Sequence, residues 1–245
     1  MHHPPTASSH PFLSLSLELK HAIFGSLPDV RSLFSVILTC RSFYHAFLGA
    51  PSLLLKIILQ RQIAPEVAFD ALVAFEASKL GPSQAKWSKR QVKEILALYT
   101  GNRSCLWSRQ WDLQDALEFS RLRDIVKFFA TGFVTTALSR HPTGLLDPPA
   151  TTLRDVSPAE LHRIQRTIYR FDLYCNLFKK KSPTRPTKGA KLVWAVPFTL
   201  QEQQAFFFER FSVWENEQLA CVHDFLDECL SIRRRPVTRL WKSVG

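Results

Sequence analysis

Glycine and cysteine are both scarce, and their scarcity limits the kinds of site that the chain can build. Only 8 of the 245 residues are glycine, so glycine-lined phosphate loops and folds rich in tight β-turns have little raw material. The cysteines are odd in number and widely spaced: Cys40, Cys105, Cys175, Cys221 and Cys229. This usage favours reduced thiols in an intracellular protein, in the cytoplasm or the nucleus, over a disulfide framework.

Long apolar runs and export signals are also missing. The sequence has no run of about 18 apolar residues, so we expect no membrane span. No Lys or Arg precedes the first apolar stretch, which turns amphipathic at Glu18 and Lys20, so we expect no signal peptide. Against these absences stand 46% hydrophobic and 12% aromatic residues, which predict a packed core in one large or two small domains.

The net charge of +11 comes from two short segments. Residues 179–191 hold six Lys or Arg and no acid, and residues 233–245 hold five and no acid. The 21 remaining basic residues balance 21 acidic ones. The segments are either a solvated linker and tail or a nuclear-localisation or polyanion-binding patch. A nucleic-acid partner is disfavoured, because such proteins more often carry a basic face on the folded body.

Catalytic and metal-binding patterns are absent from the sequence. There is no H-E-x-x-H, G-x-S-x-G, P-loop or G-x-G-x-x-G motif. Cys221, His223 and Cys229 match no trusted zinc spacing. Glu215 and Glu217 are two residues apart and so lie on different sides of a helix. We therefore expect no enzyme activity, no metal and no cofactor.

Helix-start signals recur along the chain. Ser88–Gln91, Ser157–Glu160 and Thr199–Glu202 fit capping boxes. Asp29 and Asp112 are expected to cap the helices that follow them. The fold class predicted is therefore all-α, with only residues 191–196 as a short extended candidate.

Apolar stripes at helical spacing follow these starts. One stripe is Leu161, Ile164, Ile168, Phe171 and Cys175, and a longer one is Phe207, Phe211, Trp214, Leu219, Val222, Phe225, Leu226 and Leu230. We interpret residues 205–214 as core rather than as the lining of a ligand pocket.

The organisation predicted has two folded parts. Residues 1–11 are expected to be a disordered N-terminus and residues 12–50 a helical unit of their own. A larger helical domain covers residues 51–235, with an exposed basic loop near 179–197, and residues 236–245 form a tail.

The N-terminal unit reads as three short helices. Leu19, Ile23 and Leu27 fall at every fourth position, and Pro28 ends that helix. Val30, Leu33, Phe34 and Ile37 pattern the second helix, and Phe43, Tyr44 and Phe47 the third. Helices this short need a partner to bury their apolar faces, either the rest of the chain or another protein.

Residues 12–48 resemble an F-box. Leu15-Ser16-Leu17-Glu18 is similar to the family's opening L-P-x-E, with Ser16 in place of proline. Leu27-Pro28 with Leu33, and Cys40-Arg41-Ser42-Phe43, match later parts of the pattern. Residues 160–178 and 206–226 are similar to segments of fungal F-box-like proteins whose substrates are unknown.

The resemblance implies a substrate receptor that docks the Skp-type adaptor of a cullin–RING ubiquitin ligase and presents a bound protein. The adaptor contacts or their direct supports would be Leu15, Leu17, Leu19, Ile23, Leu27, Pro28 and Leu33. Three alternatives stay open. These residues pack only on the chain's own helices, or the protein is a helical scaffold without a ligase link, or it binds nucleic acid weakly through its basic segments.

Overall fold

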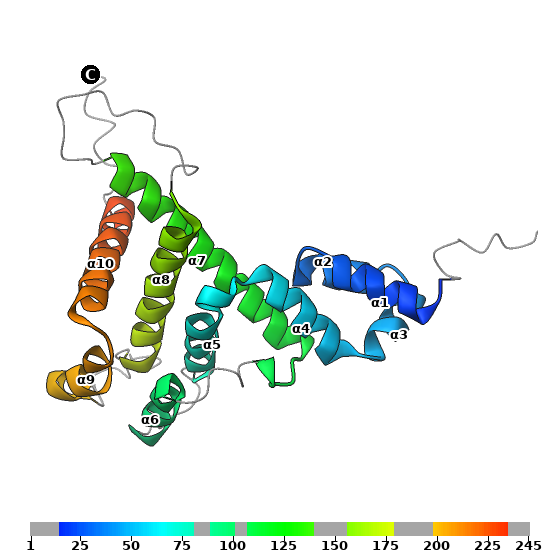
Figure 1. The fold of residues 1–245 in the computed structure, drawn as a ribbon, viewed down its shortest axis with the longest axis horizontal. Coiled ribbons are helices and arrows are strands. Elements are labelled where there is room, and N and C mark those ends of the chain that lie inside the picture. The colour runs from blue at the N-terminus through cyan, green and yellow to red at the C-terminus, as the bar shows by residue number, and fades with distance from the viewer. Residues whose placement is uncertain (1–14, 81–88, 101–106, 140–155, 179–197, 235–245) are drawn as a thin grey trace, which may run out of the picture. The chain divides into compact units, whose positions relative to one another are not determined.

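The structure is a computed structural model that describes residues 15–80, 89–100, 107–139, 156–178 and 198–234 (Figure 1). Within these ranges it has ten α-helices and no strand, which confirms the all-α fold. In the same ranges no single helix is long and apolar enough to cross a membrane. The helices Arg41–Leu48 and Pro51–Gln62 reach that length and apolar content only when taken together, and they are bent by 90° at residues 49–50. The expectations for Ser88, for residues 1–11 and 191–196 and for both basic segments lie largely or wholly outside the described residues.

The chain divides into two compact units. The first comprises residues 1–65 and 104–123, and the second comprises residues 66–103 and 124–245. The boundary that we expected after residue 50 therefore falls inside the first unit.

The first unit is built from four consecutive helices and the start of a fifth. These are α1 (Leu17–Ser26), α2 (Val30–Ile37), α3 (Arg41–Leu48), α4 (Pro51–Gln62) and the opening turns of α7 (Leu113–Ser139). As predicted, Asp29 caps α2 by accepting from the Ser32 amide at 2.7 Å, and Asp112 caps α7 by accepting from the Asp115 amide at 2.7 Å.

The core of the first unit forms where α1 and α2 each pack on α3 and α4. The buried apolar side chains of α1–α4 are Phe24, Val30, Leu33, Ile37, Ala46, Phe47, Leu54, Leu55, Ile58 and Leu59, and Ile63, Trp111, Ala116 and Phe119 complete the buried apolar set of the unit. Phe24 is fully buried and its ring lies 5.8 Å from that of Phe43. Burial of one such side chain is worth about 2–3 kcal/mol, so the unit has an apolar core within the chain itself.

The second unit contains the remaining helices. These are most of α5 (Pro65–Lys79), α6 (Lys89–Ala97), the rest of α7, α8 (Pro158–Phe178), α9 (Leu200–Phe206) and α10 (Val213–Arg234), with 3₁₀ turns at Leu98–Thr100 and Phe208–Arg210. α8 and α10 pack against each other and lie side by side in Figure 1. Ser157 accepts from the Glu160 amide at 3.2 Å, and Thr199 and Glu202 form the complete capping box that the sequence predicted.

The longer predicted stripe does not lie on one helix, because the chain breaks between α9 and α10. Ser212 starts a new helix. Its hydroxyl accepts from the Glu215 amide at 3.3 Å, and Glu215 accepts in return from the Ser212 amide at 3.0 Å. This reciprocal box satisfies amides that a helix start leaves unpaired. As a result Phe207 is fully buried while Trp214 is 73% exposed, so residues 205–214 are core only in part.

Candidate functional site

The seven residues predicted for adaptor binding differ widely in exposure. Leu17 and Leu19 are 49% and 54% exposed, and Pro28 is also exposed. Leu15, Ile23 and Leu27 are half-buried, whereas Leu33 is fully buried. Leu33 can therefore support a surface from beneath but cannot touch a partner.

The side of α1 that is buried is not the side that carries the predicted stripe of Leu19, Ile23 and Leu27. The residues of α1 that are buried are Lys20 and Phe24. Lys20 buries its aliphatic stem and donates through Nζ to Ser42 Oγ at 2.7 Å, an arrangement that long cationic side chains often adopt. Leu19 and Ile23, one turn apart, lie on a flank of the helix that the core leaves partly open.

α2 has a similar open flank that the sequence pattern did not separate from its core side. Val30, Leu33 and Ile37 are its buried residues. Phe34 and Leu38, also one turn apart, are 38% and 65% exposed. The sequence pattern grouped Phe34 with the three buried residues. Periodicity alone does not tell whether an apolar residue next to a buried stripe faces the core or the solvent.

The turn between α1 and α2 is held in place by the rest of the first unit. Arg61 of α4 donates to the backbone carbonyl of Leu27 at 3.4 Å. His21 hydrogen-bonds through Nε2 to the carbonyl oxygen of Ala46 at 2.8 Å. The open flanks of α1 and α2 are therefore presented by a backbone that α3 and α4 fix.

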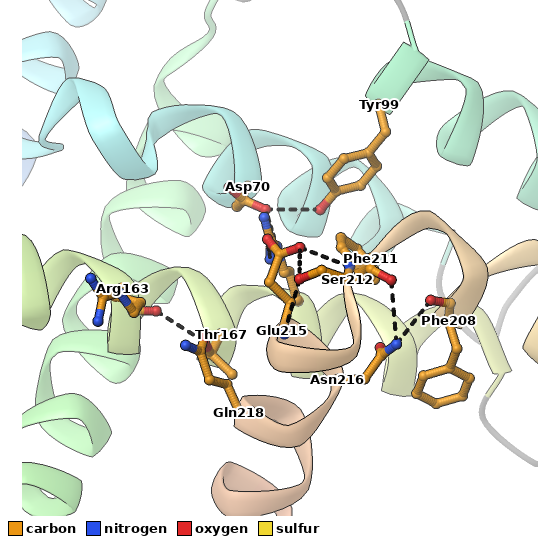
Figure 2. Close-up of polar contacts among 11 residues, drawn as sticks. Asp70, Tyr99, Arg163, Thr167, Phe208, Phe211, Ser212, Glu215, Asn216 and Gln218 are labelled. Atoms are coloured by element: carbon orange, nitrogen blue, oxygen red, sulfur yellow. Dashed lines mark hydrogen bonds and ion pairs between the residues drawn. The ribbon is translucent and has the colours of Figure 1, made fainter.

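The second unit contains a buried polar cluster that sequence reasoning missed (Figure 2). Arg170 of α8 donates through Nε to Asp70 of α5 at 2.8 Å and through Nη1 to Glu215 of α10 at 2.7 Å. Tyr99 donates its hydroxyl to the same Asp70 carboxylate at 3.1 Å. The Arg170 guanidinium also lies 4.5 Å from the centre of the Phe211 ring, so the cluster joins α5, α8 and α10.

The pKa values of the cluster reflect burial and pairing together. Burial alone would lower the pKa of Arg170, but the charge and hydrogen bonds of Asp70 and Glu215 raise it above its ordinary value. Burial opposes ionisation of Glu215, yet hydrogen bonds from Arg170 and Ser212 bring its pKa below the ordinary value. Burial, followed by the charge of Asp70, raises the pKa of Tyr99 well above its ordinary range. Pairing therefore favours the charged forms of Arg170 and Glu215, and burial keeps the phenol of Tyr99 neutral.

This arrangement is one that stabilises a fold rather than one that performs chemistry. The side chains of Asp70 and Arg170 are only 5% and 10% exposed, and their polar atoms bind one another. One signal in the sequence was available: Asp70 is the single charge in the run Val67–Phe75 of α5, and a carboxylate in a buried stretch calls for a partner. The sequence does not say that Arg170, 100 residues away, is that partner.

Metal-ligating side chains do not gather anywhere in the described part of the chain. No group of three His, Cys, Asp or Glu residues there is arranged to hold an ion. Cys40, Cys175, Cys221 and Cys229 are not joined in disulfide bonds.

No family model, curated protein or solved structure matches this chain.

Proposed function

We propose that the first unit docks another protein through the open flanks of α1 and α2, in the manner of an F-box on a Skp-type adaptor. The protein would then act inside the cell as a substrate receptor of a cullin–RING ubiquitin ligase, with the second unit holding the protein to be modified. Two observations support the proposal. Residues 12–48 follow the order of an F-box, and apolar side chains of α1 within that range, Leu17 and Leu19, are exposed.

The observation that carries the proposal is the exposure of Leu17 and Leu19. Each leaves about half of a leucine side chain in water, although fourteen other apolar side chains of the unit are buried in its core. Leu17 and Leu19 are two positions apart and so lie on different sides of α1, and it is Leu19 that shares the open flank with Ile23. Exposed leucines on short helices are typical of protein-interaction surfaces. The alternative in which these residues only pack on the chain's own helices does not account for this exposure.

The size of the effect follows from the area that remains exposed. Burying a whole leucine is worth about 1.5–3 kcal/mol, so the exposed halves of two leucines are together worth about 2 kcal/mol. Aspartate at both positions removes this contribution and adds the cost of desolvating two carboxylates. We expect Leu17→Asp/Leu19→Asp to weaken adaptor binding by at least about 30-fold.

The test is a binding titration of purified Skp-type adaptor against the full chain, by isothermal calorimetry. Two matched controls add a carboxylate elsewhere: Ala22→Asp on the exposed side of α1, and Phe128→Asp at a residue of the second unit that is 71% exposed. We expect wild type and Phe128→Asp to bind alike. Ala22→Asp should retain more affinity than the double variant, and circular dichroism should show all four proteins folded.

Two results would contradict the proposal. If folded wild-type protein does not bind the adaptor, the ligase link is wrong and a helical scaffold without that link is the better description. If the double variant binds as tightly as wild type, the adaptor is held by some other surface.

A further inference from the structure

A second surface feature lies in the second unit, where α8 meets the start of α10. A hollow of about 270 Å³ opens there. Its lining is Arg163, Arg166, Thr167, Arg170, Trp214, Glu215 and Gln218. Figure 2 shows Arg163, Thr167 and Gln218 beside the buried polar cluster. The hollow is smaller than the roughly 300–1,000 Å³ of common small-molecule sites, so it suits one side chain better than a cofactor.

The three arginines of this hollow are in different situations. Arg170 is committed to Asp70 and Glu215. The guanidinium groups of Arg163 and Arg166 meet no carboxylate among the described residues. Arg163 and Arg166 are three positions apart on α8 and therefore share one side of the helix. Two unpaired guanidinium groups side by side form a recognition element for an anionic group.

Trp214 and Gln218 complete the wall on the α10 side. Trp214 is 73% exposed, although tryptophan side chains are on average highly buried. The capping box of Ser212 fixes the backbone two residues before it. The Thr167 hydroxyl donates to the carbonyl of Arg163 at 2.9 Å and lies 3.5 Å from the Gln218 carbonyl oxygen, so the amide N–H groups of Gln218 serve as donors. The hollow thus offers two cations, amide donors and an aromatic surface together.

The local charge indicates which anion fits. Three guanidinium groups face two carboxylates, Asp70 and Glu215, which leaves one positive charge for a ligand. A singly charged carboxylate balances it, whereas a doubly charged phosphate leaves an excess negative charge beside Glu215. An extended nucleic-acid backbone is disfavoured further, since α10 carries five acidic residues: Glu215, Glu217, Asp224, Asp227 and Glu228.

We propose that this hollow binds a segment of a partner protein that carries a single carboxylate, which Arg163 and Arg166 hold while a neighbouring apolar side chain rests on Trp214. The site lies in the second unit and does not depend on adaptor docking by the first. Failure of one proposal therefore leaves the other standing, since this test contains no adaptor.

The experiment measures fluorescence anisotropy of labelled peptides with the full chain. The probe is a fluorescein-labelled peptide, Gly-Phe-Glu-Phe-Gly, and its partners carry Gln or phosphoserine in place of Glu. A labelled oligothymidine of similar size is the nucleic-acid probe. We expect the Glu peptide to bind at least about tenfold more tightly than the Gln peptide, the scale of one charge-assisted contact.

Variants locate the binding. Arg163→Met/Arg166→Met should abolish the preference for Glu over Gln. Arg31→Met/Arg121→Met removes the same charge from exposed positions of the first unit and should leave the preference intact. Arg163→Lys, which keeps the charge and loses the planar fork, should fall between. Trp214→Ala should weaken both peptides, whereas Trp214→Phe should weaken them less.

Three results would overturn the proposal. Equal binding of the Glu and Gln peptides removes the charge argument. Tighter binding of the phosphoserine peptide assigns the site to phosphate instead of carboxylate. Binding of the oligothymidine that the Arg163→Met/Arg166→Met variant loses assigns it to nucleic acid. Unchanged thermal melting of each variant keeps these results independent of folding.

Discussion

Replacing Asp70 with alanine removes the carboxylate to which both Arg170 and Tyr99 donate in the second unit. The substitution leaves a guanidinium that is only 10% exposed without its 2.8 Å partner, and it leaves the Tyr99 hydroxyl without its acceptor. Breaking one side of a buried ion pair costs about 3–5 kcal/mol. Glu215 still accepts from Arg170 at 2.7 Å and is 35% exposed, so the low end of that range applies.

We therefore expect Asp70→Ala to lower the free energy of unfolding by about 3 kcal/mol. For a chain of this size that corresponds to a fall in Tm of about 6–12 °C. Urea titration followed by far-ultraviolet circular dichroism measures the loss. Asp70→Asn keeps an acceptor without the charge and should lose less, and Asp227→Ala on the exposed side of α10 should change stability by no more than about 0.5 kcal/mol. A loss below about 1 kcal/mol for Asp70→Ala would refute the view that this pair holds α5 and α8 together.

Two further predictions concern pH. Because pairing keeps the pKa of Glu215 below its ordinary value of 4.5, its contribution to stability is present above that pH and is lost as pH falls through the lower, folded-state pKa. Glu215→Gln should therefore flatten the decline in unfolding free energy between neutral and acid pH, and an unchanged slope would contradict the pairing. The pKa of Tyr99 lies well above its ordinary 10.0, so folding resists its ionisation and stability falls as pH rises past that value. In an alkaline titration followed by phenolate absorbance, Tyr99→Phe should remove one late-ionising group, whereas loss of an early-ionising group would show that Tyr99 is not buried beside Asp70.

Local features of the fold were predictable because their causes lie within four residues. Asp29, Asp112, Ser157 and Thr199 all cap helices where the sequence placed them. Each cap needs only a short polar side chain and an amide three positions on. Ser212 follows the same pattern, with Glu215 three residues later, but it lies inside the apolar stripe Phe207–Leu230 and was not singled out as a helix start.

Features that depend on tertiary packing were not predictable in this way. Which flank of α1 faces inward is decided by α3 and α4, where Phe24 meets Phe43 and Lys20 meets Ser42. The spacing of Leu19 and Ile23 alone does not contain that information.

The same limit applies to the second unit. The pairing of Asp70 with Arg170 joins residues 100 positions apart. The hollow beside this ion pair is lined by side chains of both α8 and α10, so it depends on how these two helices pack. Trp214 belongs to the hollow because α10 begins at Val213, directly after a break in the chain's helices. Periodicity indicated helices there, but it did not indicate which of their polar side chains meet.

The most direct test of the account is hydrogen–deuterium exchange of the full chain with and without purified Skp-type adaptor. If the first unit docks as proposed, amides of residues 17–38 in α1 and α2 become protected when the adaptor is added, and the amides of α8 and α10 do not change. Protection confined to α8 and α10, or no protection at adaptor concentrations that saturate an authentic F-box protein, would contradict the central claim.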